Sequence, residues 1–248
     1  MVDTDADQVL EFDTNGGVVA SWGSMGTTAG QFKNPFGLAV GADGNVYVAD
    51  SGNRRVEVFS ANGVFVKQID STSLGGDSFS YPIGVASTSN GDLLVSDVSN
   101  VVWQLGAAST VVAWGKNGNA NGQFNYPIGM AADASGNVYV ASYQANRIVK
   151  FNLETKAVTS FGQAGTGNGQ FANPTDVKLD KNGNLFVVDA GNNRIQEFDA
   201  NGNYLTQFGQ PNDPSQKLSH PIAMVFDSLG NLYVTDNGNS RVVKYQLQ

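Results

Sequence analysis

Several residue types are scarce or absent in this sequence of 248 residues. It has no cysteine, which excludes disulfides, zinc sites built on thiolates and cysteine nucleophiles. Its single histidine, His220, excludes any site that needs two or three imidazoles. No apolar run approaches the ~18 residues of a membrane span. We therefore expect no metal, no cofactor and no membrane-spanning segment.

Charge is also low, and it is unbalanced. Asp and Glu number 22 and Lys and Arg 14, a formal net charge of −8. An acidic surface repels phosphate, so no nucleic-acid partner is expected. The first seven residues lack the basic flank and apolar run of a signal peptide. Absent cysteine and low charge nevertheless fit an extracellular or periplasmic protein, and the compartment stays open.

An internal repeat organises the chain. Four landmarks recur at the same offsets: a proline, an apolar residue three positions before it, a turn glycine, and a polar residue fifteen positions after it. A period of this length indicates a propeller or solenoid array. The prolines, at intervals of 47, 45, 47 and 47 residues, are Pro35, Pro82, Pro127, Pro174 and Pro221. The residues fifteen positions later are Asp50, Asp97, Ser142, Asp189 and Asp236.

Each repeat reads as four short strands. In the fourth repeat we expect strands at 175–180, 185–188, 194–198 and 204–208, with hairpin turns at Asn182-Gly183 and Asn201-Gly202. No window carries helical periodicity for ten residues. Four antiparallel strands in about 45 residues make one blade of a β-propeller. The sequence therefore predicts an all-β propeller that forms one domain over residues 1–248.

Three segments of the chain resemble a known repeat family, the NHL repeat. They are the stretch from Asn45 to Phe59, which contains Asp50-Ser51-Gly52-Asn53-Arg54-Arg55, and the stretches Gly122–Gly129 and Gly169–Thr175. The resemblance implies a β-propeller over almost the whole chain. It does not imply one function, because the family includes RNA-binding, protein-binding, sugar-binding and lyase members. Function has to be argued from the site.

The number of blades is left open by the strand count. There are five first, five second and five fourth strands, but six third strands, because both Gln8–Phe12 and Arg241–Tyr245 have that pattern. We favour five blades, with Val18–Trp22 completing the last blade so that the two termini meet there; six blades, as NHL propellers usually have, is the alternative. The spare third strand would either be displaced or pair with another chain, which would give a homo-oligomer by strand swapping.

The polar landmark predicts ion pairs. A strand-starting arginine follows the landmark in four repeats, but the second repeat has Val101 in its place, and the third has Ser142 in place of the aspartate. If each aspartate pairs with the arginine of the preceding repeat, Ser142 would face Val101, so the two exceptions would replace the two partners of a single ion pair. We therefore expect inter-blade bridges, partly buried and stronger than exposed pairs. They are Asp97–Arg55, Asp189–Arg147, Asp236–Arg194 and, on five-fold closure, Asp50–Arg241.

One candidate site lies on a first strand, which in a propeller lines the central channel. Asp176 and Lys178 are two residues apart and share a strand face, whereas the other first strands are neutral. They could anchor a small ligand or ion. The more conservative interpretation is an ion pair that satisfies itself, because buried charges are usually paired.

The second candidate is the face formed by the loops that precede the first strands and follow the second strands. Aromatic and amide side chains there suit a glycan or a peptide. Alternatively, Tyr81, Tyr126 and His220 merely fill the position before proline, where the backbone is expected to be extended. The candidate residues on this face are Asn34, Phe36, Tyr81, Tyr126, Tyr143, Asn173 and His220.

These features favour a non-enzymatic binding or scaffold propeller that recognises a protein segment or a glycan on its loop face. No catalytic residue is assigned. One alternative is a lyase or ester hydrolase that uses Asp176 in the channel. The other is a shortened or engineered repeat scaffold without a dedicated ligand, because the sequence starts and stops inside a repeat.

Overall fold

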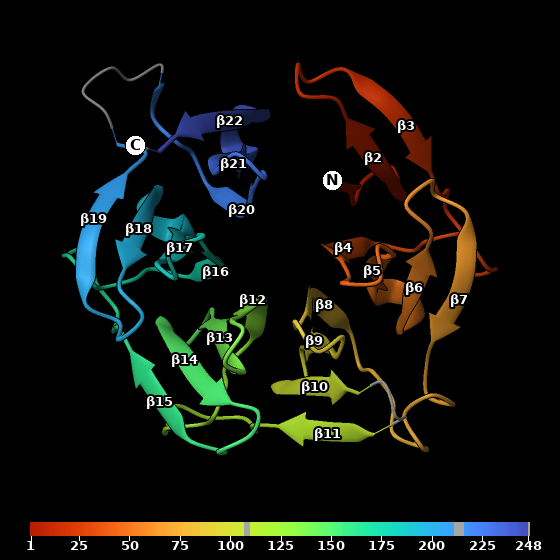
Figure 1. Cartoon of the computed structure of the whole chain (residues 1–248), viewed down its shortest axis with the longest axis horizontal. Helices are drawn as coiled ribbons and strands as arrows, with labels where there is room; N and C mark the ends of the chain where they lie inside the picture. Colours follow the sequence, from red (N-terminus) through yellow and green to blue (C-terminus); the bar gives the residue numbers. More distant parts are fainter. Residues whose placement is uncertain (107–109, 211–215, 248) are drawn as a thin grey trace. The chain divides into compact units, whose positions relative to one another are not determined.

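The fold was analysed in a computed structural model, which describes residues 1–106, 110–210 and 216–247. The chain divides into two compact units, residues 1–115 and 116–248, and each is described here by itself. In the described ranges every regular element is a β-strand or a three-residue 3₁₀ turn (Figure 1). No helix in these ranges is long and apolar enough to cross a membrane.

The first unit contains three antiparallel sheets. The first consists of β1 (Val2–Asp3), β2 (Gln8–Phe12) and β3 (Val18–Trp22). The second consists of β4 (Pro35–Val40), β5 (Val46–Asp50), β6 (Arg55–Phe59) and β7 (Phe65–Ile69), with the turn η1 (Ser51–Asn53) between β5 and β6. The third consists of β8 (Pro82–Ser87), β9 (Leu93–Asp97), β10 (Val101–Leu105) and β11 (Val111–Trp114).

The second unit also contains three. The first consists of β12 (Pro127–Ala132), β13 (Asn137–Ser142), β14 (Arg147–Asn152) and β15 (Val158–Phe161). The second consists of β16 (Pro174–Leu179), β17 (Leu185–Asp189), β18 (Arg194–Phe198) and β19 (Tyr204–Phe208), with η2 (Ala190–Asn192). The third consists of β20 (Pro221–Phe226), β21 (Asn231–Asp236) and β22 (Arg241–Gln246), with η4 (Asn237–Asn239).

The strands expected in the fourth repeat are present, to within a residue or two, as β16 to β19. The turn between β16 and β17 shows why. Gly183 has φ +84°, a left-handed conformation that favours glycine. Asp180 Oδ1 accepts the backbone N–H groups of Asn182 and Asn184, both at 2.8 Å. These hydrogen bonds lie within the turn, so its backbone conformation is stabilised locally.

The core of each unit lies between neighbouring sheets. One cluster joins Tyr139 and Ile148 of one sheet to Phe171, Val187 and Phe198 of the next. Phe171, the apolar landmark of its repeat, is fully buried. It packs so close to Gly162, at the end of β15, that a Cβ at position 162 would collide with the ring. The landmark phenylalanine thus joins consecutive sheets.

The structure corrects the favoured blade count. The described ranges contain six sheets, which confirms the six-bladed alternative, and the favoured count of five is wrong. The termini do not share a sheet: β3 pairs with β2, and β22 pairs with β21. A short hairpin turn joins β2 and β3, so their pairing has a much lower loop-closure cost than one that spans the whole chain.

Candidate functional site

The aspartate and arginine landmarks pair within one repeat, not between repeats. Arg194 Nε lies 2.7 Å from Asp189 Oδ2, and Arg55 and Arg241 make the same contact with Asp50 and Asp236 at 2.8 and 2.7 Å. The expected inter-blade bridges Asp97–Arg55, Asp189–Arg147, Asp236–Arg194 and Asp50–Arg241 are therefore wrong. The reason is strand register, since in each case the two residues are direct partners across the strands that flank the 3₁₀ turn.

Each pair fixes the loop that enters its repeat. Asp189 Oδ1 accepts the backbone N–H of Ala172, two residues before the repeat's proline, at 2.7 Å. Arg194 Nη2 donates to the carbonyls of Gly167 and Gln170 in the same loop, at 2.8 and 2.9 Å. Equivalent contacts recur around Asp50 and Arg55. These residues hold the fold, so they are poor candidates for ligand contacts.

The second and third repeats each lack one partner of the Asp–Arg pair, and the remaining residue has different contacts in each. In the second repeat Asp97 has no arginine, but its oxygens accept hydrogen bonds from the Ser80 N–H and from both the N–H and Oγ of Ser99. In the third repeat Ser142 accepts the backbone N–H of Asn125, and the buried Nε of Arg147 has no hydrogen-bond partner among the residues that the structure describes. Burial lowers the pKa of the Arg147 guanidinium.

Replacing Ser142 with Asp should stabilise the protein. One carboxylate oxygen would keep the Asn125 contact, and the other would meet Arg147 Nε, as in the intact repeats. We expect the free energy of unfolding to rise by about 1.5–3 kcal/mol, the scale of a hydrogen bond to a charged group. Urea unfolding at pH 7 measures it. Ser142→Asn is the matched control, and equal stability of the two variants would contradict the account.

The residue before the proline is not extended as expected. Asn34, Tyr126, Asn173 and His220 all have φ between +48° and +59°. An acceptor on the preceding sheet explains three of them. Asp7 Oδ1, Asn146 Oδ1 and Asn193 Oδ1 accept the backbone N–H of Asn34, Asn173 and His220, at 2.7, 2.7 and 2.6 Å. These contacts join consecutive sheets.

Tyr81 is the exception at this position, and it lacks the positive φ. The equivalent loop residue on the preceding sheet is Arg54, whose side chain has no oxygen to accept a hydrogen bond. The Tyr81 N–H donates instead to Asp97 Oδ2 at 3.1 Å. Tyr81, Asn34 and the half-exposed Phe36 all belong to the first unit.

In the second unit the structure brings three candidates together, and we call them the tyrosine cluster: Tyr126, Tyr143 and Asn173. The two tyrosine rings lie 5.9 Å apart at 54°, and the Asn173 side-chain amide donates to the Tyr143 carbonyl at 3.5 Å. Both rings are partly exposed, whereas the landmark phenylalanines are buried. His220 is exposed at the equivalent position of the next sheet. The cluster therefore presents aromatic surface outside the core.

Asp176 and Lys178 form an ion pair. Lys178 Nζ lies 2.6 Å from Asp176 Oδ1, which also accepts the Val177 N–H. The other oxygen accepts the backbone N–H of Met224, on the next sheet, at 3.0 Å. Both carboxylate oxygens of this buried side chain are thus occupied. Its clearest role is to join β16 to β20.

One buried acid, Glu57 on β6, is not predicted by any sequence pattern. Its side chain is fully buried, and Oε1 contacts Arg55 Nη2 at 3.0 Å and accepts the Gly30 N–H at 3.2 Å. Oε2 is buried and has no hydrogen-bond partner in the described part of the chain. Burial raises the pKa of Glu57 to about 7, with a further increase from Asp50, against the lowering effects of Arg55 and of the Gly30 N–H.

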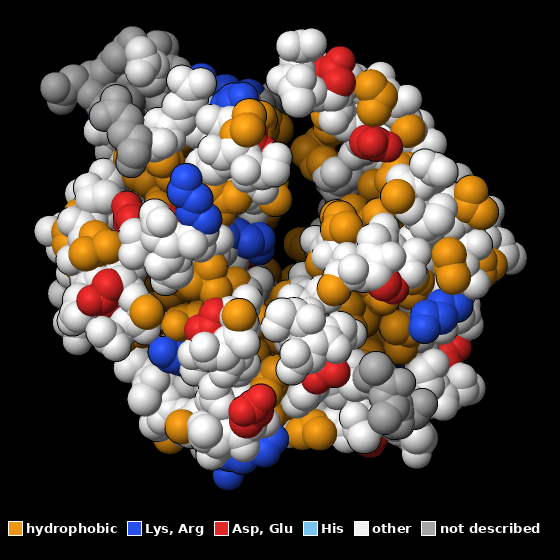
Figure 2. All heavy atoms as spheres, viewed as in Figure 1, with side chains coloured by type: hydrophobic (Ala, Val, Ile, Leu, Met, Phe, Trp, Pro, Cys, Tyr) orange, Lys and Arg blue, Asp and Glu red, His pale blue; other side chains and the backbone are white. Residues whose placement is uncertain are grey.

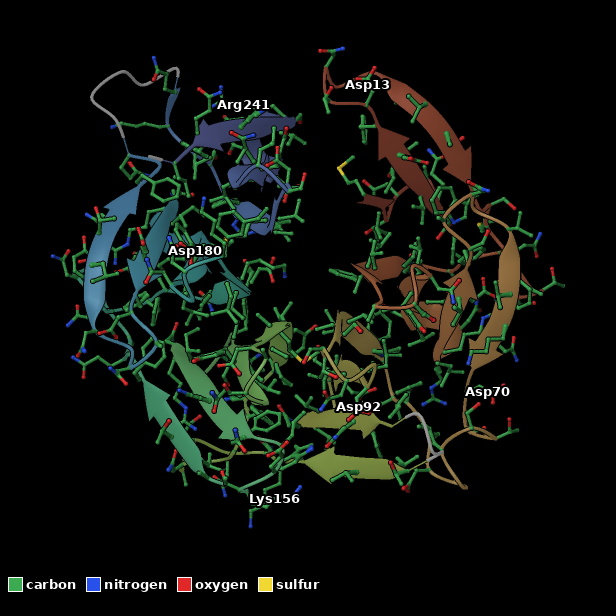
Figure 3. The ribbon with its side chains drawn as sticks, in the orientation of Figure 1. Asp13, Asp70, Asp92, Lys156, Asp180 and Arg241 are labelled. Atoms are coloured by element: carbon green, nitrogen blue, oxygen red, sulfur yellow. The ribbon has the colours of Figure 1, made fainter. Side chains whose placement is uncertain are left out.

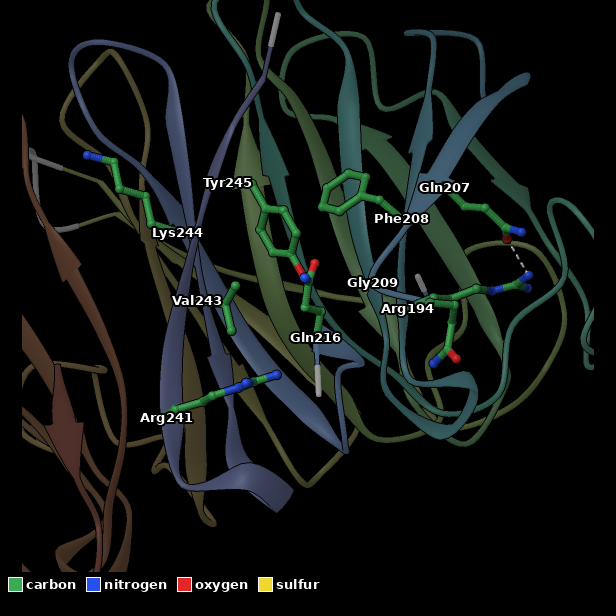
Figure 4. Close-up of a pocket in the computed structure, with 10 residues that line it drawn as sticks. Arg194, Gln207, Phe208, Gly209, Gln216, Arg241, Val243, Lys244 and Tyr245 are labelled. Atoms are coloured by element: carbon green, nitrogen blue, oxygen red, sulfur yellow. Dashed lines mark hydrogen bonds between the residues drawn. The ribbon is translucent and has the colours of Figure 1, made fainter. Parts of the chain in front are cut away.

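The structure also shows a groove of about 590 Å³ between β19 and β22 (Figure 4). Its walls carry Phe208 and Gln207 from β19, and Arg241, Val243 and Tyr245 from β22. In the described ranges, no group of three or more His, Cys, Asp or Glu side chains is placed to hold a metal ion. The groove and the tyrosine cluster are two candidate binding surfaces of the second unit.

Comparison with known families agrees with this repeat structure. The model of the NHL repeat matches residues 32–59, 171–198 and 218–245. The chain carries NHL repeats. Each matched segment runs from the buried apolar landmark to the third strand, so it contains the Asp–Arg pair of that NHL repeat. No curated protein sequence matches the chain.

Solved structures with the same fold have varied functions. One is a catalytically inactive His-to-Ala variant of virginiamycin B lyase from Staphylococcus aureus with quinupristin, with TM-score 0.69 and 18% identity over 99% of this chain and 79% of that one. Another is a putative gluconolactonase, at 0.67 and 16% over 85% and 73%. A chain of a nidogen/laminin complex gives 0.70 and 17% over 97% and 85%. At these identities the likeness shows the fold alone, a β-propeller.

Proposed function

We propose that this NHL-repeat protein is a non-enzymatic binding propeller that holds a protein segment on the loop face of its second unit. The observation that carries the proposal is the tyrosine cluster. Tyr126 and Tyr143 make an aromatic pair that is not part of the buried core, and the side-chain amide of Asn173 lies beside it. Tyrosines are enriched in binding hot spots because the ring buries a large area while the hydroxyl stays hydrogen-bonded. A propeller in a protein complex is among the structural neighbours.

An enzyme that uses Asp176 is the second candidate, and the lyase and putative gluconolactonase neighbours are the reason to keep it. The local geometry supports it less well. Both carboxylate oxygens of Asp176 already accept hydrogen bonds, one from Lys178 and the other from the Met224 N–H, so the side chain is held in place by the fold. The one histidine, His220, is exposed, and its backbone N–H is held by Asn193. A scaffold without a dedicated ligand would leave the tyrosine cluster without a role.

Removing the two tyrosines of the tyrosine cluster should weaken binding. Peptides selected from a random phage library on the wild-type protein should bind Tyr126→Ala/Tyr143→Ala at least about tenfold more weakly, the cost of losing hot-spot tyrosines. The control variant is Tyr204→Ala, which removes a tyrosine of the outer strand β19. The same peptides should bind it as tightly as they bind the wild-type protein. Fluorescence anisotropy measures the three affinities, and circular dichroism confirms that each variant is folded.

Two outcomes would contradict the proposal. Selected peptides that bind the double variant as well as wild type would move the site elsewhere. Binding on a glycan array that needs Tyr126 and Tyr143, without any selected peptide, would make the ligand a glycan.

A further inference from the structure

The third repeat has an arginine without the aspartate that accompanies it in three other repeats. Ser142 stands in the place of the aspartate, directly opposite Arg147 across β13 and β14. A serine carries no negative charge, and Arg147 forms no ion pair with the residues that the structure describes. The aspartates that pair with the Nε of an arginine elsewhere are Asp50, Asp189 and Asp236.

The Nε atom of Arg147 is also shielded from water. Water solvates the charged side chains that reach the surface in Figure 2. Lys156, labelled in Figure 3, is such a residue, exposed on the turn that follows β14. Nε of Arg147, in contrast, is buried and lacks a hydrogen-bond partner in the described ranges. The other guanidinium nitrogens hold the side chain in place, because they donate at 2.6, 2.6 and 2.9 Å to the carbonyls of Asn119, Ala120 and Gln123.

The fourth repeat shows what normally lies beside this atom. Asp189 Oδ2 accepts the Nε–H of Arg194 at 2.7 Å. The side-chain amides of Asn192 and Gln196 donate to the same oxygen at 2.8 and 3.0 Å. The third repeat has a smaller side chain at each of the three positions that surround the arginine. These residues are Ser142, Ala145 and Val149.

The backbone of the two repeats is alike, so the difference lies in these side chains. Ser142 is paired with Arg147 in the same register as Asp189 with Arg194. Ser142 Oγ accepts the backbone N–H of Asn125 at 2.9 Å, as Asp189 Oδ1 accepts the equivalent N–H at 2.7 Å. The serine thus replaces one carboxylate oxygen. The other oxygen, which binds the arginine in the fourth repeat, has no counterpart, and the smaller side chains leave room for a small group there.

The charge at this position favours an anion. Burial lowers the pKa of the Arg147 guanidinium, and no acidic group in the described ranges counteracts this effect. An arginine nevertheless stays protonated at neutral pH, and a buried charge without a partner is costly. Ser142 Oγ offers a second donor, because its own hydrogen bond to Asn125 O is long, at 3.3 Å. An anion would accept the charge-assisted hydrogen bond that the aspartate accepts elsewhere.

We propose that the third repeat binds a small monovalent anion, such as chloride, at the position that the aspartate carboxylate holds in the intact repeats. Arg147 Nε donates to the anion and supplies the opposite charge, and the Ser142 hydroxyl is the second donor. The size of the replaced group limits the ligand to an ion about as large as a carboxylate. The proposal does not rest on the tyrosine cluster.

Thermal unfolding of the full chain tests the chemistry of the site. Sodium gluconate is replaced stepwise by sodium chloride at constant ionic strength. We expect the Tm of the wild-type protein to rise and saturate, by roughly 2–5 °C, because an ion that binds only the folded state stabilises it. Ser142→Asp is the matched control, since it carries its own carboxylate. Its Tm should not show the saturating rise, so its advantage over wild type should shrink as chloride is added.

Anomalous diffraction from a crystal grown in sodium bromide tests the location independently of any variant. Bromide should give a peak within hydrogen-bond distance of Arg147 Nε, and none beside the Nε of Arg55 or Arg194, where an aspartate is already bound.

Three results would overturn the proposal. One is a wild-type Tm that shows no saturating response to chloride. The second is a response that wild type and Ser142→Asp share, because the ion would then act elsewhere. The third is a crystal grown in bromide that has only a water molecule beside Arg147 Nε.

Discussion

Glu57→Gln should leave the protein as stable as wild type at pH 4.5 and make it roughly 2–4 kcal/mol more stable at pH 8. The folded-state pKa of Glu57 is raised to about 7 from the ordinary 4.5. The folded protein therefore binds a proton more tightly than the unfolded chain. The stability that this carboxyl contributes is fully present below pH 4.5, falls between pH 4.5 and 7, and is absent above pH 7. Glutamine does not titrate, so the variant lacks this loss.

The repeat explains why a glutamine fits. The residue equivalent to Glu57 on β18 is Gln196, whose Oε1 accepts the Gly169 N–H at 2.9 Å, as Glu57 Oε1 accepts that of Gly30. Gln196 Nε2 donates to Gln170 O at 2.7 Å and Asp189 Oδ2 at 3.0 Å. Oε2 of Glu57 takes the place of this donor, and only a protonated carboxyl can donate there. An ionised Glu57 leaves a buried oxygen unpaired.

Urea unfolding of both proteins between pH 4 and 8 measures this effect. Gln196→Glu is the matched control, because it should create the same pH dependence in the second unit. A stability difference between Glu57→Gln and wild type that is equal at pH 4.5 and pH 8 would contradict the account.

Asp189→Ala should destabilise the protein by about 3–5 kcal/mol, the cost of leaving a buried charge without its partner. The lost carboxylate binds Arg194 Nε, Asn192 Nδ2, Gln196 Nε2 and the Ala172 N–H. Asp97→Ala should lower the free energy of unfolding by less, about 1–3 kcal/mol, because it leaves backbone N–H groups without an acceptor but leaves no arginine without its partner. Urea unfolding at pH 7 compares the two variants.

A double variant separates the charge from the packing. Asp189→Ala/Arg194→Leu should recover part of the loss, because it removes the stranded guanidinium as well. If the double variant is less stable than Asp189→Ala, or if Asp189→Ala and Asp97→Ala are equally stable, the pair does not act as the geometry suggests.

The sequence predicts the repeat, because the turn at Asn182-Gly183 and the buried Phe171 are determined by local chemistry and period. It does not predict the ion pairs. The coincidence of Val101 and Ser142 suggests bridges between repeats, yet each substitution is tolerated alone: Ser99 and backbone N–H groups satisfy Asp97, and Ser142 keeps the Asn125 contact. Register across the turn decides the pairing, and sequence spacing does not reveal which contacts a lone residue keeps.

The candidate sites were predicted in part. Tyr126, Tyr143 and Asn173 do come together, but the left-handed backbone at Asn173 depends on Asn146, an acceptor on another sheet that no local pattern identifies. The expected pairing of Val18–Trp22 with Arg241–Tyr245 is wrong, because Val18–Trp22 is paired with Gln8–Phe12. The contacts of Glu57 cannot be predicted from local sequence, because one comes from Arg55 and the other from the loop at Gly30.

Hydrogen exchange of the full chain, with and without a peptide selected on the wild-type protein, tests most directly whether the protein binds a protein segment at the tyrosine cluster. The account predicts that amides of the loops that carry Tyr126, Tyr143 and Asn173 exchange more slowly when the peptide is added, while the amides of β18 do not change. Protection that appears elsewhere and leaves these loops unchanged would contradict it.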